Sequence, residues 1–205
     1  MSVGYVKPPW ETHCVKCGGY LTSGSCTACS SPGTLSEIKT IPDGLPGTTR
    51  IIADMRTLVL AAYKDERINQ LARHITIDCV GHDYLCEAKT ALSWMQEHFR
   101  YTRLPWHPLG FQRVQTPSYT LFDAPVKTGE CASLTTALAA ILMSLGFEVQ
   151  FRSAGSDASD PDNYEHVYGI VSVPLHGWLA FEPSYPLALG QEHDKVAVRR
   201  DWAIA

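Results

Sequence analysis

GECASLTTALAAILMSLGFEVQFR, residues 129–152, is the stretch that decides the fold of this chain. Its first half predicts a helix from Cys131 to Leu145, because leucine and isoleucine recur there at helical spacing and Gly146 can end the helix. Its second half predicts a strand over residues 147–153, directly after the glycine. A cysteine therefore stands at the start of a helix that leads into a β-strand.

The sequence before this stretch predicts further helices and a loop. Apolar residues recur with helical spacing over residues 49–75, with a junction at Asp65 and Glu66, and again over residues 84–99. Residues 100–130 hold four prolines and little periodicity, which predicts a long loop. A loop of that length in a compact domain is usually functional.

The sequence after it predicts strands. Apolar, strand-like runs cover residues 167–173 and 178–181, and the polar tail after Gly190 is expected to lie on the surface. Helices followed by strands predict an α+β fold.

Composition and charge exclude several classes of protein. The chain has 205 residues, of which 45% are apolar and 19% charged, so it can form one core of ordinary size. A net charge of -4 without a polybasic block excludes electrostatic binding to nucleic acid. The longest strongly apolar run has about 12 residues, and a membrane span needs about 20. The N-terminus has no apolar leader, so a cytoplasmic protein with reduced thiols is expected.

Two Cys-x-x-Cys pairs near the N-terminus predict a metal site. Four thiolates can close tetrahedrally around one structural Zn²⁺ ion, which would explain how a segment poor in large aliphatic residues folds. An iron–sulfur cluster is a less favoured metal, and two redox pairs or disulfides are the alternative. The zinc-knuckle module is predicted over residues 1–34, a linker over 35–48 and the main domain over 49–205. The predicted ligands are Cys14, Cys17, Cys26 and Cys29.

Four later residues form a candidate catalytic site. Cys131 begins a helix, where free N–H groups and the helix dipole favour a thiolate. His166 begins one strand and Glu182 ends the next, so antiparallel pairing would bring them level, and the carboxylate would orient the imidazole. Gln115, on the long loop, could join the Cys131 N–H in an oxyanion hole. Each residue taken alone is compatible with an ordinary structural role. The order of the four residues along the chain favours a catalytic role.

Cys79 and Cys86 flank a predicted helix start and have no matching histidine. They are expected to be buried free thiols.

Residues 75–185 resemble the transglutaminase-like superfamily, a circularly permuted relative of papain-type thiol hydrolases. The resemblance is carried by EHFRY, VQTPSYTL, GECASLTTALAAILMSLGFEVQFR, EHVYGIVSV and GWLAFEPSYP. It implies helices packed on one face of a small antiparallel sheet, with Cys131 as nucleophile, His166 as base and Glu182 as the third triad member. MRTLVLAAY and INQLARHIT also resemble the variant encoded by tailed bacteriophages and prophages.

The chain departs from the family pattern at three places. Glu130 stands where an aspartate usually precedes the cysteine, and Ala132 and Ser133 replace an acidic pair. Glu182 replaces the usual aspartate of the triad, and its longer arm requires a different strand offset. None of these changes removes a catalytic group.

Two hypotheses about function follow. The first is a cysteine hydrolase, peptidase or transamidase that acts on amide bonds of a protein or peptide through an acyl-enzyme. The second is a virion protein of a phage tail or head that docks onto other virion proteins through its zinc knuckle and the aromatic loop with Trp106 and His107, with or without cleavage of cell-wall peptides. An intact set of catalytic residues favours the enzyme.

Overall fold

The computed structural model of the protein describes residues 41–102 and 114–204. The four cysteines predicted to bind zinc lie outside this part of the chain, as do Trp106 and His107. The described residues from Pro42 onward form one compact unit. No helix within the described residues has both the length and the apolar character that a membrane span requires.

Within the described residues, three α-helices precede the central stretch, as the spacing of apolar residues predicted. The first helix begins inside the predicted linker. The junction at Asp65 and Glu66 is confirmed, because the Asp65 carboxylate accepts from the Arg67 N–H at 2.8 Å and caps the second helix. Asp83 caps the third by accepting from the Cys86 N–H at 3.0 Å. The helices are α2 (Gly44–Ala62), α3 (Glu66–Ile75) and α4 (Tyr84–His98).

Four antiparallel strands form the main sheet, in the order β5-β4-β3-β6. Three are the strands that the sequence predicted, with bounds shifted by up to two residues. The fourth was not predicted: residues after Gly190 lie mostly at the surface, as expected, but return to pair with β3 as an edge strand. The strands are β3 (Glu148–Gly155), β4 (His166–Val173), β5 (Gly177–Phe181) and β6 (Val198–Ala203).

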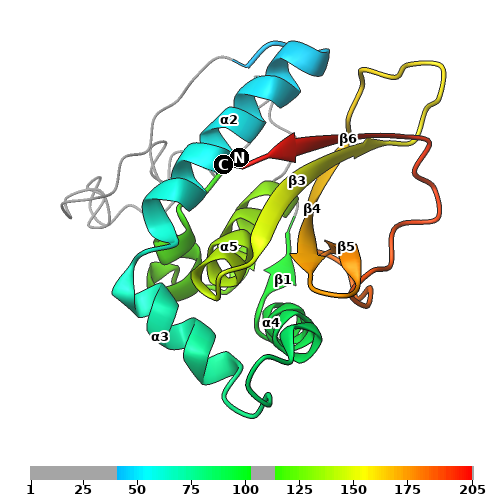
Figure 1. Cartoon of the computed structure of the whole chain (residues 1–205). Coiled ribbons are helices and arrows are strands. Elements are labelled where there is room, and N and C mark those ends of the chain that lie inside the picture. Colours follow the sequence, from blue (N-terminus) through cyan, green and yellow to red (C-terminus); the bar gives the residue numbers. More distant parts are fainter. Residues whose placement is uncertain (1–40, 103–113, 205) are drawn as a thin grey trace, which may run out of the picture. The chain divides into compact units, whose positions relative to one another are not determined.

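Helix α5 (Cys131–Ser144) is the centre of the fold (Figure 1). The three preceding helices pack against it, and on another side it contacts β3 and β4. Every residue of its first three turns is buried, rather than only the leucine face that the sequence predicted. Small alanine and threonine side chains fill the other faces of α5 and allow the neighbouring helices and strands to approach it closely from several directions. The α+β fold expected from the order of elements is confirmed.

The predicted long loop contains short regular elements. Strand β1 (Arg100–Tyr101) pairs in parallel with β2 (Thr128–Gly129), and a π-helical turn, η1 (Tyr119–Asp123), lies between them in sequence. Two-residue strands give no periodic signal, which is why the sequence did not reveal them. The pairing fixes the chain immediately before Cys131.

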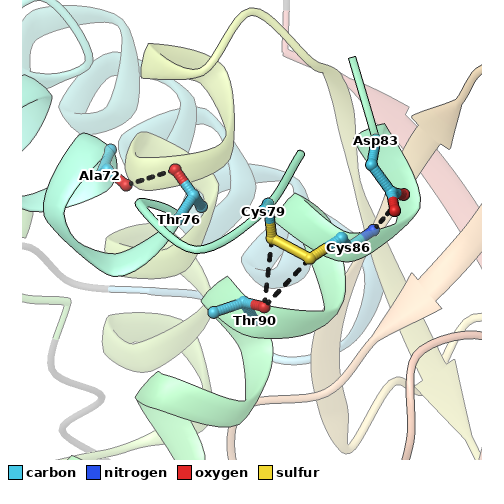
Figure 2. The surroundings of a disulfide bond; sticks show 6 residues. All are labelled: Ala72, Thr76, Cys79, Asp83, Cys86 and Thr90. Carbon is cyan, nitrogen blue, oxygen red and sulfur yellow. Dashed lines mark hydrogen bonds between the residues drawn. A yellow bond between two sulfur atoms is a disulfide. The ribbon is translucent and has the colours of Figure 1, made fainter. Parts of the chain in front are cut away.

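Cys79 and Cys86 form a disulfide, so the expectation of two buried free thiols is wrong (Figure 2). The loop before α4 brings their Cα atoms to 5.8 Å, within the range that a disulfide spans. Both residues are half-buried, and the Thr90 hydroxyl lies 3.6 Å from the Cys79 sulfur. The bond ties the α3–α4 connection to the first turn of α4. Such bonds persist in oxidising surroundings, whereas the sequence predicted a reducing cytosol.

Removing this disulfide should lower the free energy of unfolding. Replacing both Cys79 and Cys86 by alanine releases a short closed loop in the unfolded chain, which should cost about 2 kcal/mol. Urea unfolding of the variant and of the oxidised protein measures the difference. The tryptic peptide over residues 74–89 contains both cysteines, so the bonded form must appear lighter by two hydrogen atoms. Two freely alkylated thiols in native, unreduced protein would contradict the bond.

Candidate active site

Cys131 is the first residue of α5 and the free cysteine of the described part of the chain. Its side chain is buried against the core. The first-turn N–H groups of a helix have no helical acceptor, and the helix dipole places partial positive charge at this end. Both effects favour a negative sulfur at this position.

His166 and Glu182 are brought together by the pairing of β4 with β5. The Nε2 atom of His166 lies 2.5 Å from Oε2 of Glu182. The register pairs Gly169 with Phe181, so its continuation places Glu182 opposite Tyr168 and diagonal to His166, rather than level with His166 as the sequence suggested. The longer arm of glutamate spans this diagonal. Both residues are thus on the same face of the sheet.

Glu182 is a buried carboxylate with several hydrogen-bond donors. Its side chain is 1% exposed. Oε1 accepts from the Ser184 N–H at 2.8 Å, and Oε2 accepts from His193 Nε2 at 2.9 Å as well as from His166. A buried charge is stable only when such partners replace water. The hydrogen bonds fix both oxygens and aim one of them at the His166 ring.

His166 is held in its protonated form. Burial alone would lower its pKa, but hydrogen bonds to Cys131 and Glu182 and the charges of both groups outweigh burial and raise the pKa to about 10. Because Nε2 faces Glu182, Nδ1 is the nitrogen left for Cys131. An imidazolium between a carboxylate and a sulfur stabilises the thiolate form of that sulfur.

Gln115 lies beside the first turn of α5, as the sequence suggested. Its backbone N–H donates to the Ser133 hydroxyl at 3.0 Å, two residues beyond Cys131. Its side-chain Oε1 accepts from the Thr120 hydroxyl at 3.2 Å. With the carbonyl end of the amide engaged in this way, Nε2 is the end that can donate to an oxyanion.

Two residues of the site were not found from the sequence. His193 has no metal-ligand spacing to any other histidine in the sequence, yet it contacts Glu182. Gln96, on α4, donates from Nε2 to the carbonyl oxygens of Glu182, Tyr185 and Leu187 at 2.8–3.0 Å. It holds the chain that follows the catalytic candidate Glu182. Neither residue has a local signal, because each acts through a contact with a distant segment.

Two of the solved structures that resemble this chain have low similarity to it. A protein of Parabacteroides distasonis named a putative protease has 12% identity and a TM-score of 0.48, with 74% of this chain and 32% of that chain covered. A protein of Cytophaga hutchinsonii named a putative cysteine protease has 12% identity and a TM-score of 0.45, with 82% and 55% covered. This chain therefore spans about a third to a half of their length. No match was found among curated proteins.

The comparison with family models is more decisive. The model of the transglutaminase-like superfamily matches residues 69–183, which is more than half of the chain. The match includes Cys131, His166 and Glu182, and agrees closely with the residues whose motifs carried the resemblance in the sequence. The chain belongs to the transglutaminase-like superfamily.

Proposed function

We propose that the protein is a cysteine hydrolase or transamidase that transfers the acyl group of an amide bond through a thioester with Cys131. The observation that carries this proposal is the position of His166, which bonds to Glu182 through one nitrogen and interacts with Cys131 through the other. A cysteine with only a structural role needs neither a histidine beside its sulfur nor a carboxylate that orients that histidine. The substrate class is a protein or peptide.

The reaction starts from a thiolate and an imidazolium. The proton of the Cys131 thiol resides on Nδ1 of His166, and the sulfur attacks the carbonyl carbon. The oxyanion that forms accepts hydrogen bonds from the Cys131 N–H and the Gln115 amide. His166 then donates its proton to the leaving amine, and the acyl group remains on Cys131. Neutral His166 next takes a proton from water in hydrolysis, or from a second amine in transamidation.

Acylation by p-nitrophenyl acetate tests the identity of the nucleophile. The wild-type protein should release a burst of p-nitrophenol equal to one equivalent, and Cys131→Ser should show no burst. Trypsin yields a peptide over residues 128–152 in which Cys131 is the one cysteine, so mass spectrometry locates the acetyl group. Adding methylamine to the acetylated protein after removal of excess ester then separates hydrolysis from transamidation, because a transamidase should release N-methylacetamide faster than acetate. An acetyl group found only on other residues would refute the proposal.

We also propose that Cys14, Cys17, Cys26 and Cys29 bind one structural Zn²⁺ ion. The support is the spacing of two Cys-x-x-Cys pairs, which suits a closed tetrahedral site. Elemental analysis of protein purified without added metal should give about one zinc per chain. Cys26→Ser should lower that content while the acyl transfer at Cys131 persists. Disulfides among these four cysteines would contradict the proposal.

The phage origin and the virion role stay predictions. They depend on the resemblance of MRTLVLAAY and INQLARHIT to phage-encoded members, and on the docking role suggested for segments outside the described residues. The cytoplasmic site of synthesis is likewise a prediction. The intact geometry around Cys131 favours the enzyme as the primary proposal.

A further inference from the structure

We propose that His193 is a positioning residue of the same site, which donates a second hydrogen bond to Glu182 and thereby fixes the carboxylate that orients His166. This inference rests on the proposed acyl transfer at Cys131. It assigns a role to a histidine that comes from a different part of the chain, after β5 and before β6.

The first support is the arrangement of donors around Glu182. Oε2 accepts from His166 at 2.5 Å and from His193 at 2.9 Å, and Oε1 accepts from the Ser184 N–H. Because the carboxylate is buried, water does not readily replace a missing donor. Without His193, Oε2 would keep a single donor, and the carboxylate would be freer to rotate away from the His166 ring.

The second support is the way the chain holds His193 in place. The segment that carries it is anchored at both ends to the sheet: the Gly190 N–H donates to Ala180 O at 2.7 Å, and the Ala197 N–H donates to Gly155 O at 2.9 Å. The segment over residues 190–197 is therefore fixed to the sheet at both ends, and we call it the strap.

The residue next to His193 adds an electrostatic anchor. Glu192 forms ion pairs with Arg152 of β3 and Arg199 of β6. The Arg152 side chain is 15% exposed and is also held by Asp201 at 2.6 Å, so its position is well defined. An exposed ion pair contributes little, but a network around a largely buried arginine restricts the backbone on which His193 stands.

Aromatic rings complete the surroundings of His193. The Tyr185 ring stands edge-on to His193 at 4.7 Å between centroids and edge-on to His166 at 5.6 Å. The Tyr168 ring stacks on His166 at 5.9 Å. These rings limit rotation of both imidazoles and leave the Nε2 atoms directed at Glu182.

A metal ion is a less suitable occupant of this cluster. The ligand atoms of His166, Glu182 and His193 lie within 4.8 Å of one another, so they could in principle hold a cation. However, two ligands of a tetrahedral zinc ion stand about 3.3 Å apart. Nε2–Oε2 distances of 2.5 and 2.9 Å are those of hydrogen bonds, with the imidazole protons between the atoms.

Two substitutions of His193 separate positioning from packing. His193→Phe keeps a ring beside Tyr185 and removes the donor, whereas His193→Gln removes the ring and keeps an N–H near the place of Nε2. If His193 positions Glu182, His193→Phe should lower kcat for p-nitrophenyl acetate by about tenfold with little change in KM. His193→Gln should then keep more of the rate than His193→Phe. If His193 only packs, the order reverses, and that result would overturn the inference.

A double-mutant cycle tests whether His193 acts through Glu182. In a Glu182→Met background, which has no acceptor, His193→Phe should cause no further loss. A full additional loss in that background would overturn the inference. His176→Phe is the matched control, because His176 is an exposed histidine in the β4–β5 turn. If instead Cys131→Ser leaves acyl transfer unchanged, the proposed function itself fails, and the two failures are therefore distinguishable.

Discussion

Replacing His166 by alanine should slow the acylation of Cys131 by about ten-thousandfold or more, the scale of losing one member of a catalytic triad. The variant has no group to accept the thiol proton or to return it to the leaving group. Glu182 keeps the Ser184 N–H and His193 as donors, so the fold should persist. The rate of p-nitrophenol release, measured beside a circular dichroism spectrum, gives the result. A loss of less than about tenfold would show that the imidazole does not serve the sulfur.

Two substitutions of Glu182 are controls for this prediction. Glu182→Gln keeps the imidazole and removes only its orienting charge, so it should cost less than His166→Ala. Glu182→Asp withdraws the carboxylate by one carbon–carbon bond, about 1.5 Å. Because Oε2 serves two histidines at 2.5 and 2.9 Å, aspartate should also be slower than glutamate, although aspartate is the usual residue in the family.

Replacing Gln115 by alanine should slow acylation by about a hundredfold, the usual effect of losing one oxyanion donor. Stability should change little, because the backbone N–H that bonds to Ser133 remains. Thr120→Val removes the hydroxyl that holds the Gln115 carbonyl and should give a smaller loss of the same kind. Equal rates for wild type and Gln115→Ala would exclude Gln115 from the oxyanion hole.

Local signals in the sequence were sufficient for the central helix. Gly146 ends α5 with φ +93°, and the N–H groups of Gly146 and Phe147 donate to Met143 and Leu142 at 3.1 Å, a Schellman ending. A glycine that follows regularly spaced leucines is enough to predict where this helix ends. The positions of His166 and Glu182 at strand ends were likewise predictable, because both strands are strongly apolar.

Contacts between distant segments were not predictable from the same signals. Strand β6 is mostly polar because it is an exposed edge, so it has no apolar periodicity. The contact of His193 with Glu182 depends on the path of the strap before that strand. The Cys79–Cys86 bond depends on how the chain turns into α4. In each case the decisive quantity is a distance that only the assembled fold determines.

The state of His166 also connects stability to pH. Its pKa is raised from an ordinary value of about 6.5 to about 10, so the folded protein holds a proton that the unfolded chain releases. The resulting stabilisation is fully present below about pH 6.5 and is lost as the pH rises through about 10. The contribution of His166 to stability should therefore fall between these values, and His166→Gln should remove that contribution.

The most direct test of the central claim is the NMR titration of His166. The protein has eight histidines, and the His166→Gln variant identifies the resonance. If Cys131, His166 and Glu182 form one ion-paired group, the imidazole should stay protonated through pH 8 and titrate near pH 10, and Cys131→Ala should lower that midpoint. A midpoint near the ordinary value of about 6.5 that does not respond to Cys131→Ala would contradict the account.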